Sequence, residues 1–379
     1  MKIGIFTDSY LPTPTGVAVS VETFRKGMEH LGHDVYIFAP EFPKYRDPIP
    51  RVHRYPSFFT PVRPDAPLVL PILNKHIGEI EKIGLDIIHT QHFFTLGALG
   101  LQLGKKLRIP VVHTYHTLYV EYANSYAPFM RGFARWWLIR KSRLYANQCQ
   151  TIIAPSPSMK KLIRAYGIVT PIEAIPTGVK MDDFASMPPE TMKHKYSIPT
   201  DRQVLLFVGR LGEEKNIKFL LRAFKIIWQK RENTHLMFIG GGPQEDDYKK
   251  IVERQPFADH VTFTGFLPKG ETNKIFGACD VFVFPSITDA QGVVIAETMA
   301  AGTPAVAVNR LGPTDLIRDG EDGFLTPLNE HAFADKVIYL LENEKIRRHF
   351  GQAARKNVQR FSTENSTRHM LEVYERLVN

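Results

Sequence analysis

The 379-residue sequence contains only two cysteines, Cys149 and Cys279. Two thiols are too few for a disulfide framework or a cysteine zinc site, and their scarcity favours a reducing compartment, the cytosol. No apolar run approaches the ~18 residues that a membrane-spanning helix needs. The apolar start at residues 1–6 soon meets Asp8, so we expect neither a signal peptide nor a transmembrane helix there. If this protein meets a membrane, we expect it to lie on the surface.

Acidic residues are missing from a long internal stretch. Between Glu121 and Glu173 the chain carries eight Lys and Arg but no Asp or Glu. Residues 1–175 hold 21 Lys+Arg against 12 Asp+Glu, whereas the remainder is balanced, so the whole net charge of +9 lies in the first half. This asymmetry indicates attraction to a polyanion, either lipid headgroups or nucleic acid. An ordinary solvated face is the alternative.

Strand-like runs alternate with helical periodicity along the whole chain, which predicts α/β architecture with parallel sheets covered by helices on both faces. The runs are residues 2–6, 35–39, 86–90, 110–115 and 151–154, and then 204–208, 235–239, 261–263, 280–284 and 304–308. Between the two groups, residues 176–201 contain Pro188, Pro189 and Pro199 with little apolar periodicity, as in an interdomain connection.

We therefore expect two Rossmann-like, doubly wound domains, 1–175 and 176–361, with a C-terminal helix at about 362–379 packing back on the first. Ligands of such sheets bind beyond the carboxyl ends of the strands. Two facing domains would then enclose one substrate cleft.

Two strand-to-helix loops carry residues suited to a phosphorylated ligand. The loop at 7–17 contains Gly16, whose backbone could approach a phosphate at a helix N-terminus. The loop at 207–216 places Arg210 and Lys215 between strand and helix, where two cations and a helix dipole could converge on a diphosphate. A plain turn and a pair of exposed capping charges are the alternatives.

A third loop, at 285–304, places Asp289 before a helix and Glu297 about one turn inside it. Carboxylates accept hydrogen bonds from hydroxyl pairs, and the amides of Gly292 and Val293 form the positive end of that helix. One site could hold a sugar, a diphosphate and a ribose in sequence. As an isolated pair the two carboxylates mean little.

These motifs together resemble the retaining glycosyltransferase family 4 of GT-B fold. The matching features are Gly-Arg-Leu-Gly-Glu-Glu-Lys-Asn at 209–216, the spacing Asp289-x7-Glu297, and Glu-Thr-Met-Ala-Ala-Gly-Thr-Pro at 297–304. The first half is similar to bacterial diacylglycerol glucosyltransferases through residues 6–12, 16–17, 32–38, 88–91 and 111–119, and Thr-Asp-Ala-Gln-Gly at 288–292 also fits. The resemblance implies a first domain that receives the acceptor and a second that binds the nucleotide sugar.

The resemblance also implies a hexosyltransferase of the EC 2.4.1 type that uses a nucleotide sugar, UDP-glucose, and no further cofactor. Front-face transfer is implied, with the departing diphosphate oxygen taking the acceptor proton, and such a reaction requires no metal. The sequence has no Asp-x-Asp loop and no His/Cys cluster at ligand spacing, so no metal site is expected.

Carried over by position, the resemblance assigns the donor-site residues. Arg210 and Lys215 would neutralise the diphosphate, Glu297 would hold the ribose and Asp289 would meet the sugar. The family usually has Glu at position 289, so the shorter Asp leaves the donor sugar open. Backbone and base contacts are implied at Gly16, Gly209, Phe266, Leu267, Gly292 and Val293. His116 is implied to lie near the transferring sugar, with a structural histidine as the alternative.

Residues 129–143 mix paired tryptophans with cations at roughly helical spacing, the composition of a helix that lies among lipid headgroups. The side chains expected to meet an anionic membrane are Arg131, Arg135, Trp136, Trp137, Arg140, Lys141 and Arg143. The alternative is a helix whose tryptophans are buried against the sheet.

Three functions remain open from the sequence. The first is a peripheral glycosyltransferase acting on a lipid such as diacylglycerol at the cytoplasmic, inner face of the cell membrane. The second is a soluble family 4 enzyme that acts on a polysaccharide or small molecule. The third, a basic nucleic-acid-binding protein, lacks any RNP, KH or helix-turn-helix pattern, so we expect no nucleic-acid partner.

Overall fold

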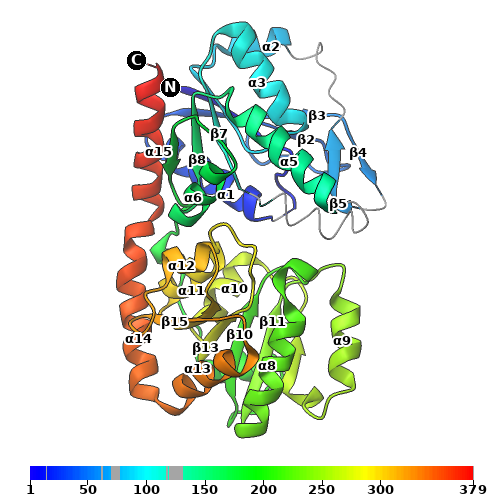
Figure 1. The fold of residues 1–379 in the computed structure, drawn as a ribbon, viewed down its shortest axis with the longest axis vertical. Helices are drawn as coiled ribbons and strands as arrows, with labels where there is room; N and C mark the ends of the chain where they lie inside the picture. Colours follow the sequence, from blue (N-terminus) through cyan, green and yellow to red (C-terminus); the bar gives the residue numbers. More distant parts are fainter. Residues whose placement is uncertain (14, 61–62, 70–76, 117, 119–130, 379) are drawn as a thin grey trace. The chain divides into compact units, whose positions relative to one another are not determined.

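The computed structural model describes residues 1–13, 15–60, 63–69, 77–116, 118 and 131–378. The chain divides into two compact units: unit 1 is Met1–Gly178 with Thr363–Asn379, and unit 2 is Val179–Ser362. Each unit is built on a parallel sheet with helices packed against it (Figure 1). The predicted fold class, two doubly wound α/β domains, is confirmed.

Unit 1 contains a seven-stranded sheet in the order β3-β2-β1-β6-β7-β8-β9, parallel throughout, and a separate antiparallel pair, β4-β5. The strands are β1 (Lys2–Phe6), β2 (Asp34–Pro40), β3 (Val52–Tyr55), β4 (Ser57–Thr60), β5 (Arg63–Val69), β6 (Ile87–Thr90), β7 (Val111–Thr114), β8 (Thr151–Ala154) and β9 (Ile172–Ala174). Apolar residues fill the central strands because both faces of such a sheet are covered.

The helices of unit 1 include one from the far end of the chain. They are α1 (Gly16–His30), α2 (Ile77–Ile83), α3 (Thr95–Leu107), α5 (Arg131–Ala146), α6 (Pro157–Ala165) and α15 (Thr363–Val378). The apolar face of α1, with Val21, Phe24 and Met28, shares a core with Met370 and Tyr374 of α15. The last 17 residues of the chain therefore complete the first sheet's core.

Unit 2 contains a six-stranded parallel sheet in the order β12-β11-β10-β13-β14-β15. Its strands are β10 (Gln203–Val208), β11 (Thr234–Ile239), β12 (Val261–Phe263), β13 (Val281–Phe284), β14 (Ala305–Val308) and β15 (Gly323–Thr326). Its helices are α7 (Pro189–Lys195), α8 (Ile217–Lys230), α9 (Glu245–Glu253), α10 (Lys269–Phe276), α11 (Val293–Ala301), α12 (Gly312–Leu316), α13 (Glu330–Glu342) and α14 (Glu344–Val358). Short 3-10 turns lie at η2 (Met181–Asp183), η3 (Glu213–Lys215), η4 (Ala258–His260) and η5 (Gln359–Phe361).

The prediction that residues 176–201 form an interdomain connection is wrong from Val179 onward, because these residues belong to unit 2. Helix α7 lies inside this segment, and Phe184, Met192 and Ile198 are buried in the core of unit 2. Two of the three prolines that suggested a linker, Pro188 and Pro189, lie at the start of α7, where a missing N–H costs no intrahelical hydrogen bond.

In each sheet the direction in which successive strands are added reverses at one point, called here the switch point. In unit 1 the order runs outward from β1 on one side and from β6 on the other, and in unit 2 the corresponding pair is β10 and β13. The loops that follow such a pair diverge, and the crevice between them is where α/β sheets bind ligands. The loops after β1 and β6, and after β10 and β13, are therefore the places to look for a site.

Candidate functional site

Two residues predicted for the donor site meet at the switch point of unit 2. Lys215 ends the loop after β10 and Asp289 lies in the loop after β13, and Lys215 Nζ lies 2.7 Å from each carboxylate oxygen of Asp289. The two side chains are 18% and 21% exposed. Partial burial strengthens their attraction, and a charged hydrogen bond of this kind contributes about 1.5–3 kcal/mol. An ammonium and a carboxylate are thus held side by side where a ligand can reach them.

The backbone of these loops is locked by hydrogen bonds to one another. Ser286 and Thr288 hydroxyls donate to the carbonyl of Glu214 at 3.4 and 3.2 Å, and the Asn216 amide donates to the carbonyl of Pro285 at 3.3 Å. Because these bonds join residues more than 65 positions apart, the placement of Lys215 and Asp289 is fixed by both loops.

The loop after β11 packs closely against the loop after β10, and glycine makes this close approach possible. Gly240 follows β11 with φ of 123°, and a Cβ added there would lie 2.1 Å from the carbonyl oxygen of Gly209. Only glycine allows both this backbone conformation and this contact. Gly209 is thus confined between β10 and the loop after β11, and partly buried Arg210 follows it directly.

The helix α11 presents the predicted amides and the second carboxylate. Gly292 lies before its first residue, Val293, in the left-handed conformation with φ of 78°. Glu297 follows one turn later with a side chain 14% exposed, and its Oε1 accepts a hydrogen bond of 2.8 Å from Lys269 Nζ at the start of α10. The carboxylate predicted to hold ribose therefore has a cation from the neighbouring helix.

Phe266 and Leu267, predicted to contact the nucleotide base, differ in exposure. Phe266 is 71% exposed, and its ring lies against Gly241, where an added Cβ would come within 2.7 Å of the ring edge. Leu267 packs against the core of unit 2. Of the two, Phe266 has the more exposed side chain.

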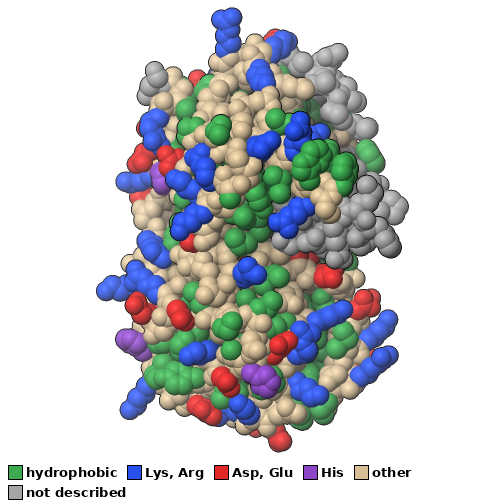
Figure 2. Space-filling view, viewed as in Figure 1, with side chains coloured by type: hydrophobic (Ala, Val, Ile, Leu, Met, Phe, Trp, Pro, Cys, Tyr) green, Lys and Arg blue, Asp and Glu red, His purple; other side chains and the backbone are tan. Residues whose placement is uncertain are grey.

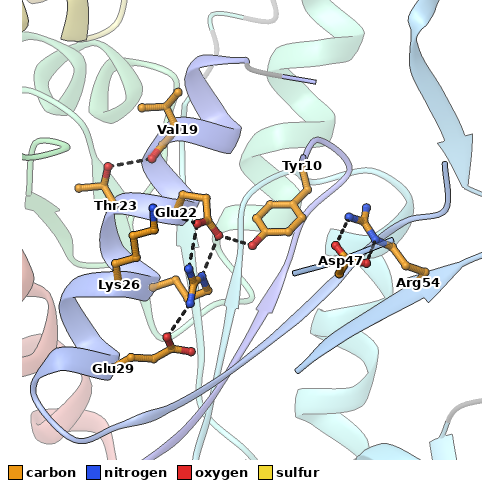
Figure 3. Close-up of polar contacts among 9 residues, drawn as sticks. Tyr10, Val19, Glu22, Thr23, Lys26, Glu29, Asp47 and Arg54 are labelled. Carbon is orange, nitrogen blue, oxygen red and sulfur yellow. Dashed lines mark hydrogen bonds and ion pairs between the residues drawn. The ribbon is translucent and has the colours of Figure 1, made fainter. Parts of the chain in front are cut away.

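In unit 1 the loop after β1 is anchored at two points, and Figure 3 shows the first of them, the contact of Tyr10 with Glu22. The Tyr10 hydroxyl donates to Glu22 of α1, whose carboxylate also accepts from Arg25 at 2.7 Å. Arg54 donates to the carbonyl of Leu11 at 2.8 Å while pairing with Asp47 at 2.5 Å. Burial raises the pKa of Tyr10 and keeps it a hydrogen-bond donor.

The anchored loop ends at the predicted phosphate-facing glycine. The Thr15 hydroxyl caps α1 by accepting from the Ala18 amide at 3.2 Å, and Gly16, the first residue of the helix, is exposed with open space around it. Asp8, earlier in the same loop, accepts from the Leu96 amide at 2.9 Å and caps α3. As far as the described residues show, the start of α1 is therefore open to a ligand.

His116 follows β7 and pairs with a residue that follows β6. Its Nε2 lies 2.6 Å from the amide oxygen of Gln91. Burial, with the nearby rings of His92 and His113, lowers the pKa of His116 to about 3, so the ring is neutral near pH 7. Because an amide oxygen only accepts, the ring carries its proton on Nε2 and presents Nδ1 as an acceptor.

Two further histidines lie in the sheet beneath His116. His113 is hydrogen-bonded to Thr90 at 3.0 Å, as a structural residue. His89 contacts the Thr114 hydroxyl at 2.6 Å and the Tyr374 hydroxyl of α15 at 2.5 Å. Burial lowers the pKa of both rings to about 3.

Helix α5 carries an exposed row of aromatic and basic side chains, called here the α5 stripe. It consists of Phe133, Trp136, Trp137, Arg140, Lys141 and Leu144, spaced by three or four residues so that they share one helix face. Trp136 is 54% and Trp137 is 40% exposed, so the alternative of tryptophans buried against the sheet is wrong. Over α5, Figure 2 shows hydrophobic side chains interleaved with Lys and Arg.

Cations cover the rings of the stripe. Arg140 lies 5.7 Å from the ring centre of Trp136, and Lys141 lies 5.1 Å from that of Trp137. Arg135 is exposed on the other side of the helix, whereas Arg143 lies against Gly167. The side chain of Arg131 lies outside the described residues. The stripe thus joins apolar area to positive charge.

Two absences among the described residues bear on membrane and metal binding. No helix among them is long and apolar enough to cross a membrane. In the same part of the chain, no three His, Cys, Asp or Glu side chains are grouped so that they could hold a metal ion.

The sequence reasoning missed the partners that hold these groups. Gln91, Lys269 and Arg54 were not singled out. Gln91 stands directly after a predicted strand, a position that could have marked it. Lys269 and Arg54 pair with residues 28 and 7 positions away, and no spacing rule connects them.

Comparisons with solved structures identify the class. Sucrose-phosphate synthase from Thermosynechococcus elongatus superposes with a TM-score of 0.81 at 22% identity, covering 100% of this chain and 99% of that one. Anabaena Alr3699/HepE in complex with UDP and glucose has a TM-score of 0.81 at 20% identity, covering all of both chains. The two sheets and these likenesses define a GT-B fold.

Sequence comparisons identify the family. Residues 14–183 match "Glycosyltransferase Family 4" and residues 189–357 match "Glycosyl transferases group 1". An alpha-monoglucosyldiacylglycerol synthase of Streptococcus pneumoniae is 32% identical over 356 residues, 90% of this chain and 78% of that protein. One from Acholeplasma laidlawii is 29% identical over 360 residues, 91% of this chain and 89% of that protein. The chain belongs to glycosyltransferase family 4.

A relative whose name states another activity is similar to this chain over a comparable length. GDP-mannose-dependent alpha-mannosyltransferase of Mycolicibacterium smegmatis is 28% identical over 368 residues, 94% of this chain and 92% of that protein. Membership of the family therefore establishes glycosyl transfer but not the sugar or the acceptor.

Proposed function

We propose that this glycosyltransferase moves glucose from UDP-glucose to diacylglycerol at the inner face of the cell membrane, with retention of the anomeric configuration. The observation that carries the lipid acceptor is the α5 stripe, in which exposed tryptophans alternate with cations as on helices that lie in a headgroup layer. Two relatives that bear the name alpha-monoglucosyldiacylglycerol synthase support the same acceptor and sugar.

In this proposal the cations of unit 2 stabilise the leaving group. Arg210 and Lys215 face the diphosphate, together with the amides at the start of α11. As the C1–O bond to the diphosphate breaks, negative charge grows on the leaving oxygen, and preorganised cations lower the free energy of that state. Lys215 has three N–H donors, and bonds to Asp289 leave it one donor for a phosphate oxygen.

The acceptor hydroxyl attacks C1 on the face from which the diphosphate departs. The new bond forms between the acceptor oxygen and C1, and the acceptor proton passes to the departing diphosphate oxygen. No protein nucleophile is needed, and no metal takes part in the proposed step. The work of the protein is to orient the donor and to offset charge.

The two carboxylates divide the recognition of the donor. Asp289, held by Lys215, accepts hydrogen bonds from sugar hydroxyls, and Glu297 accepts them from the ribose hydroxyls. Phe266 lies beside the base. In unit 1 we propose that the backbone N–H of Gly16 donates a hydrogen bond to a phosphate. We also propose that Nδ1 of His116 accepts a hydrogen bond from a substrate hydroxyl.

The α5 stripe is proposed to bind anionic lipid reversibly. Arg140 and Lys141 would contribute roughly 1 kcal/mol each near such a surface. The aromatic rings add apolar area, which salt does not screen. Arg131 and Arg143 remain predicted contributors, whereas Arg135 lies on the side of α5 opposite the stripe and is not proposed to meet the lipid.

A donor screen with and without lipid tests the proposal. Purified protein is incubated with UDP-glucose, UDP-galactose or GDP-mannose, and nucleotide release is measured alone, with a water-soluble sugar acceptor, with phosphatidylglycerol vesicles, and with the same vesicles containing diacylglycerol. We expect release from UDP-glucose to rise only when diacylglycerol is present. A rise caused equally by a water-soluble sugar acceptor without lipid would support the soluble-acceptor function instead.

A further inference from the structure

The ion pair between Lys269 and Glu297 joins two parts of the proposed nucleotide site. Lys269 is the first residue of α10, and directly follows residues 265–268, which include exposed Phe266. Its Nζ lies 2.8 Å from Glu297 Oε1 of α11, the carboxylate to which the proposed function assigns the ribose hydroxyls. The pair therefore connects the proposed base contact to the proposed ribose contact.

Lys269 is an unfavourable residue for its position in the helix. A cation at a helix N-terminus opposes the positive end of the helix dipole. The acidic residue in the first turn of α10, Glu271, bonds instead to Lys195 and to the Tyr196 hydroxyl. Glu297 from the neighbouring helix is thus the carboxylate that compensates Lys269.

The pairing leaves Glu297 able to bind a diol. An ionised carboxylate offers about four lone-pair sites on two oxygens, and Lys269 occupies one of them. The side chain of Glu297 is 14% exposed and that of Lys269 is 53% exposed, so the carboxylate is enclosed while the ammonium reaches solvent. Holding one oxygen fixes the rotation of the carboxylate and therefore the direction of its remaining lone pairs.

We propose that Lys269 is a positioning residue of the nucleotide site, which orients Glu297 toward the ribose hydroxyls and offsets its charge against the incoming diphosphate. This inference rests on the proposed role of Glu297. It predicts that Lys269 affects how well the protein distinguishes a ribose from a deoxyribose, without itself touching the nucleotide.

The test compares the binding of UDP with that of 2′,3′-dideoxy-UDP by calorimetric titration, and the ratio of the two dissociation constants measures the ribose contact. We expect the full-length protein to prefer UDP by about 10- to 100-fold. Lys269→Met, which keeps the aliphatic stem, should lower this preference at least threefold. Lys269→Gln should do the same, and Lys269→Arg should restore most of it.

Lys274→Met is the matched control. Lys274 is an exposed lysine on the same helix, so its loss changes the net charge equally without touching Glu297, and the preference should stay unchanged. Glu297→Gln should reduce the preference to within a fewfold of one. In that background, Lys269→Met should have no further effect.

The possible failures are distinguishable. If Lys269→Met and Lys269→Gln keep the parental preference while Glu297→Gln abolishes it, the inference is overturned and the ribose role of Glu297 stands. If Glu297→Gln keeps the preference, the proposed role of Glu297 is wrong, and the positioning role of Lys269 falls with it. If Lys274→Met and Lys269→Met lose the preference for UDP equally, the loss is caused by the change in net charge, and the inference is also overturned.

Discussion

Replacing Lys215 by Met tests the charge arrangement at the switch point of unit 2. The ammonium bonds both oxygens of Asp289 at 2.7 Å, and the two side chains are about one fifth exposed. The substitution removes a cation proposed to face the diphosphate and leaves a partly buried carboxylate without its partner. Asp289→Asn removes the charge of the carboxylate and leaves the lysine.

The size of the effect follows from this geometry. At ~4 Å and an effective dielectric constant of ~20, the attraction between two unit charges is about 4 kcal/mol before desolvation. Desolvation reduces the net value, and hydrogen bonds to charged groups contribute about 1.5–3 kcal/mol. We therefore expect a coupling of about 1.5–3 kcal/mol, or about 10- to 150-fold in rate, between the two substitutions.

The assay is a double-mutant cycle on kcat/KM for transfer from the nucleotide sugar. Lys215→Met alone should lower the rate by about 10² or more, because it removes electrostatic stabilisation of the leaving group. The double variant should lose much less than the product of the single losses. Lys218→Met, on an exposed position of α8, is the control and should stay within about twofold of the parent.

Two outcomes would refute the reasoning. Near-parental activity in Lys215→Met would remove this lysine from the donor site. Single losses that simply multiply in the double variant, within about 0.5 kcal/mol, would mean that the ion pair does not act as a unit.

Three further predictions concern membrane binding, acid stability and packing. Changing both cations of the α5 stripe to Gln should weaken binding to anionic vesicles about 30-fold in a sedimentation assay and reduce its salt dependence, and unchanged sedimentation would refute a charge contribution. His89 and His113 have folded-state pKa values lowered to about 3 by burial, against ~6.5 when unfolded, so their stabilisation is complete above pH ~6.5 and is lost as the pH falls toward 3. Urea unfolding should show a loss of up to about 1.4 kcal/mol per pH unit for each ring below pH ~6, whereas equal stability at pH 7.5 and 5 would contradict this. Gly240→Ala should destabilise the protein by about 2 kcal/mol or more because its Cβ would strike the Gly209 carbonyl, while Gly270→Ala, with open space, should leave the melting temperature within a few degrees.

The long apolar runs allowed the sheets to be predicted from the sequence. All ten predicted runs overlap observed strands, for example residues 2–6 and 151–154, because buried parallel strands are apolar on both faces. The strands that were missed are short or interrupted. Strand β9 has the charged Glu173 at its centre, and β15 begins at Gly323, so neither shows an uninterrupted apolar run.

The position of the C-terminal helix depends on contacts that no local pattern encodes. The hydrogen bond between Tyr374 and His89 joins residues 285 positions apart. The periodicity of residues 363–378 predicts an amphipathic helix, whereas its docking on α1 follows from matching apolar surfaces in three dimensions.

The candidate site could be predicted only in part. The order of the loops indicated which residues follow strands, and Lys215 and Asp289 are indeed brought together. Their bidentate pairing joins positions 74 apart, and the pairing of Glu297 with Lys269 spans two helices, so neither was evident in the sequence. The roles of these residues in binding and transfer remain predictions.

The most direct test of the proposed function is the chemical identity of the product. The protein is incubated with UDP-glucose and anionic vesicles that contain diacylglycerol, and the extracted lipid is analysed by mass spectrometry and by NMR of the anomeric proton. We predict a monohexosyl diacylglycerol with the α configuration, formed by the parent and lost in Lys215→Met. The absence of any glycosylated lipid, while a water-soluble acceptor is glycosylated under the same conditions, would contradict the lipid-acceptor function.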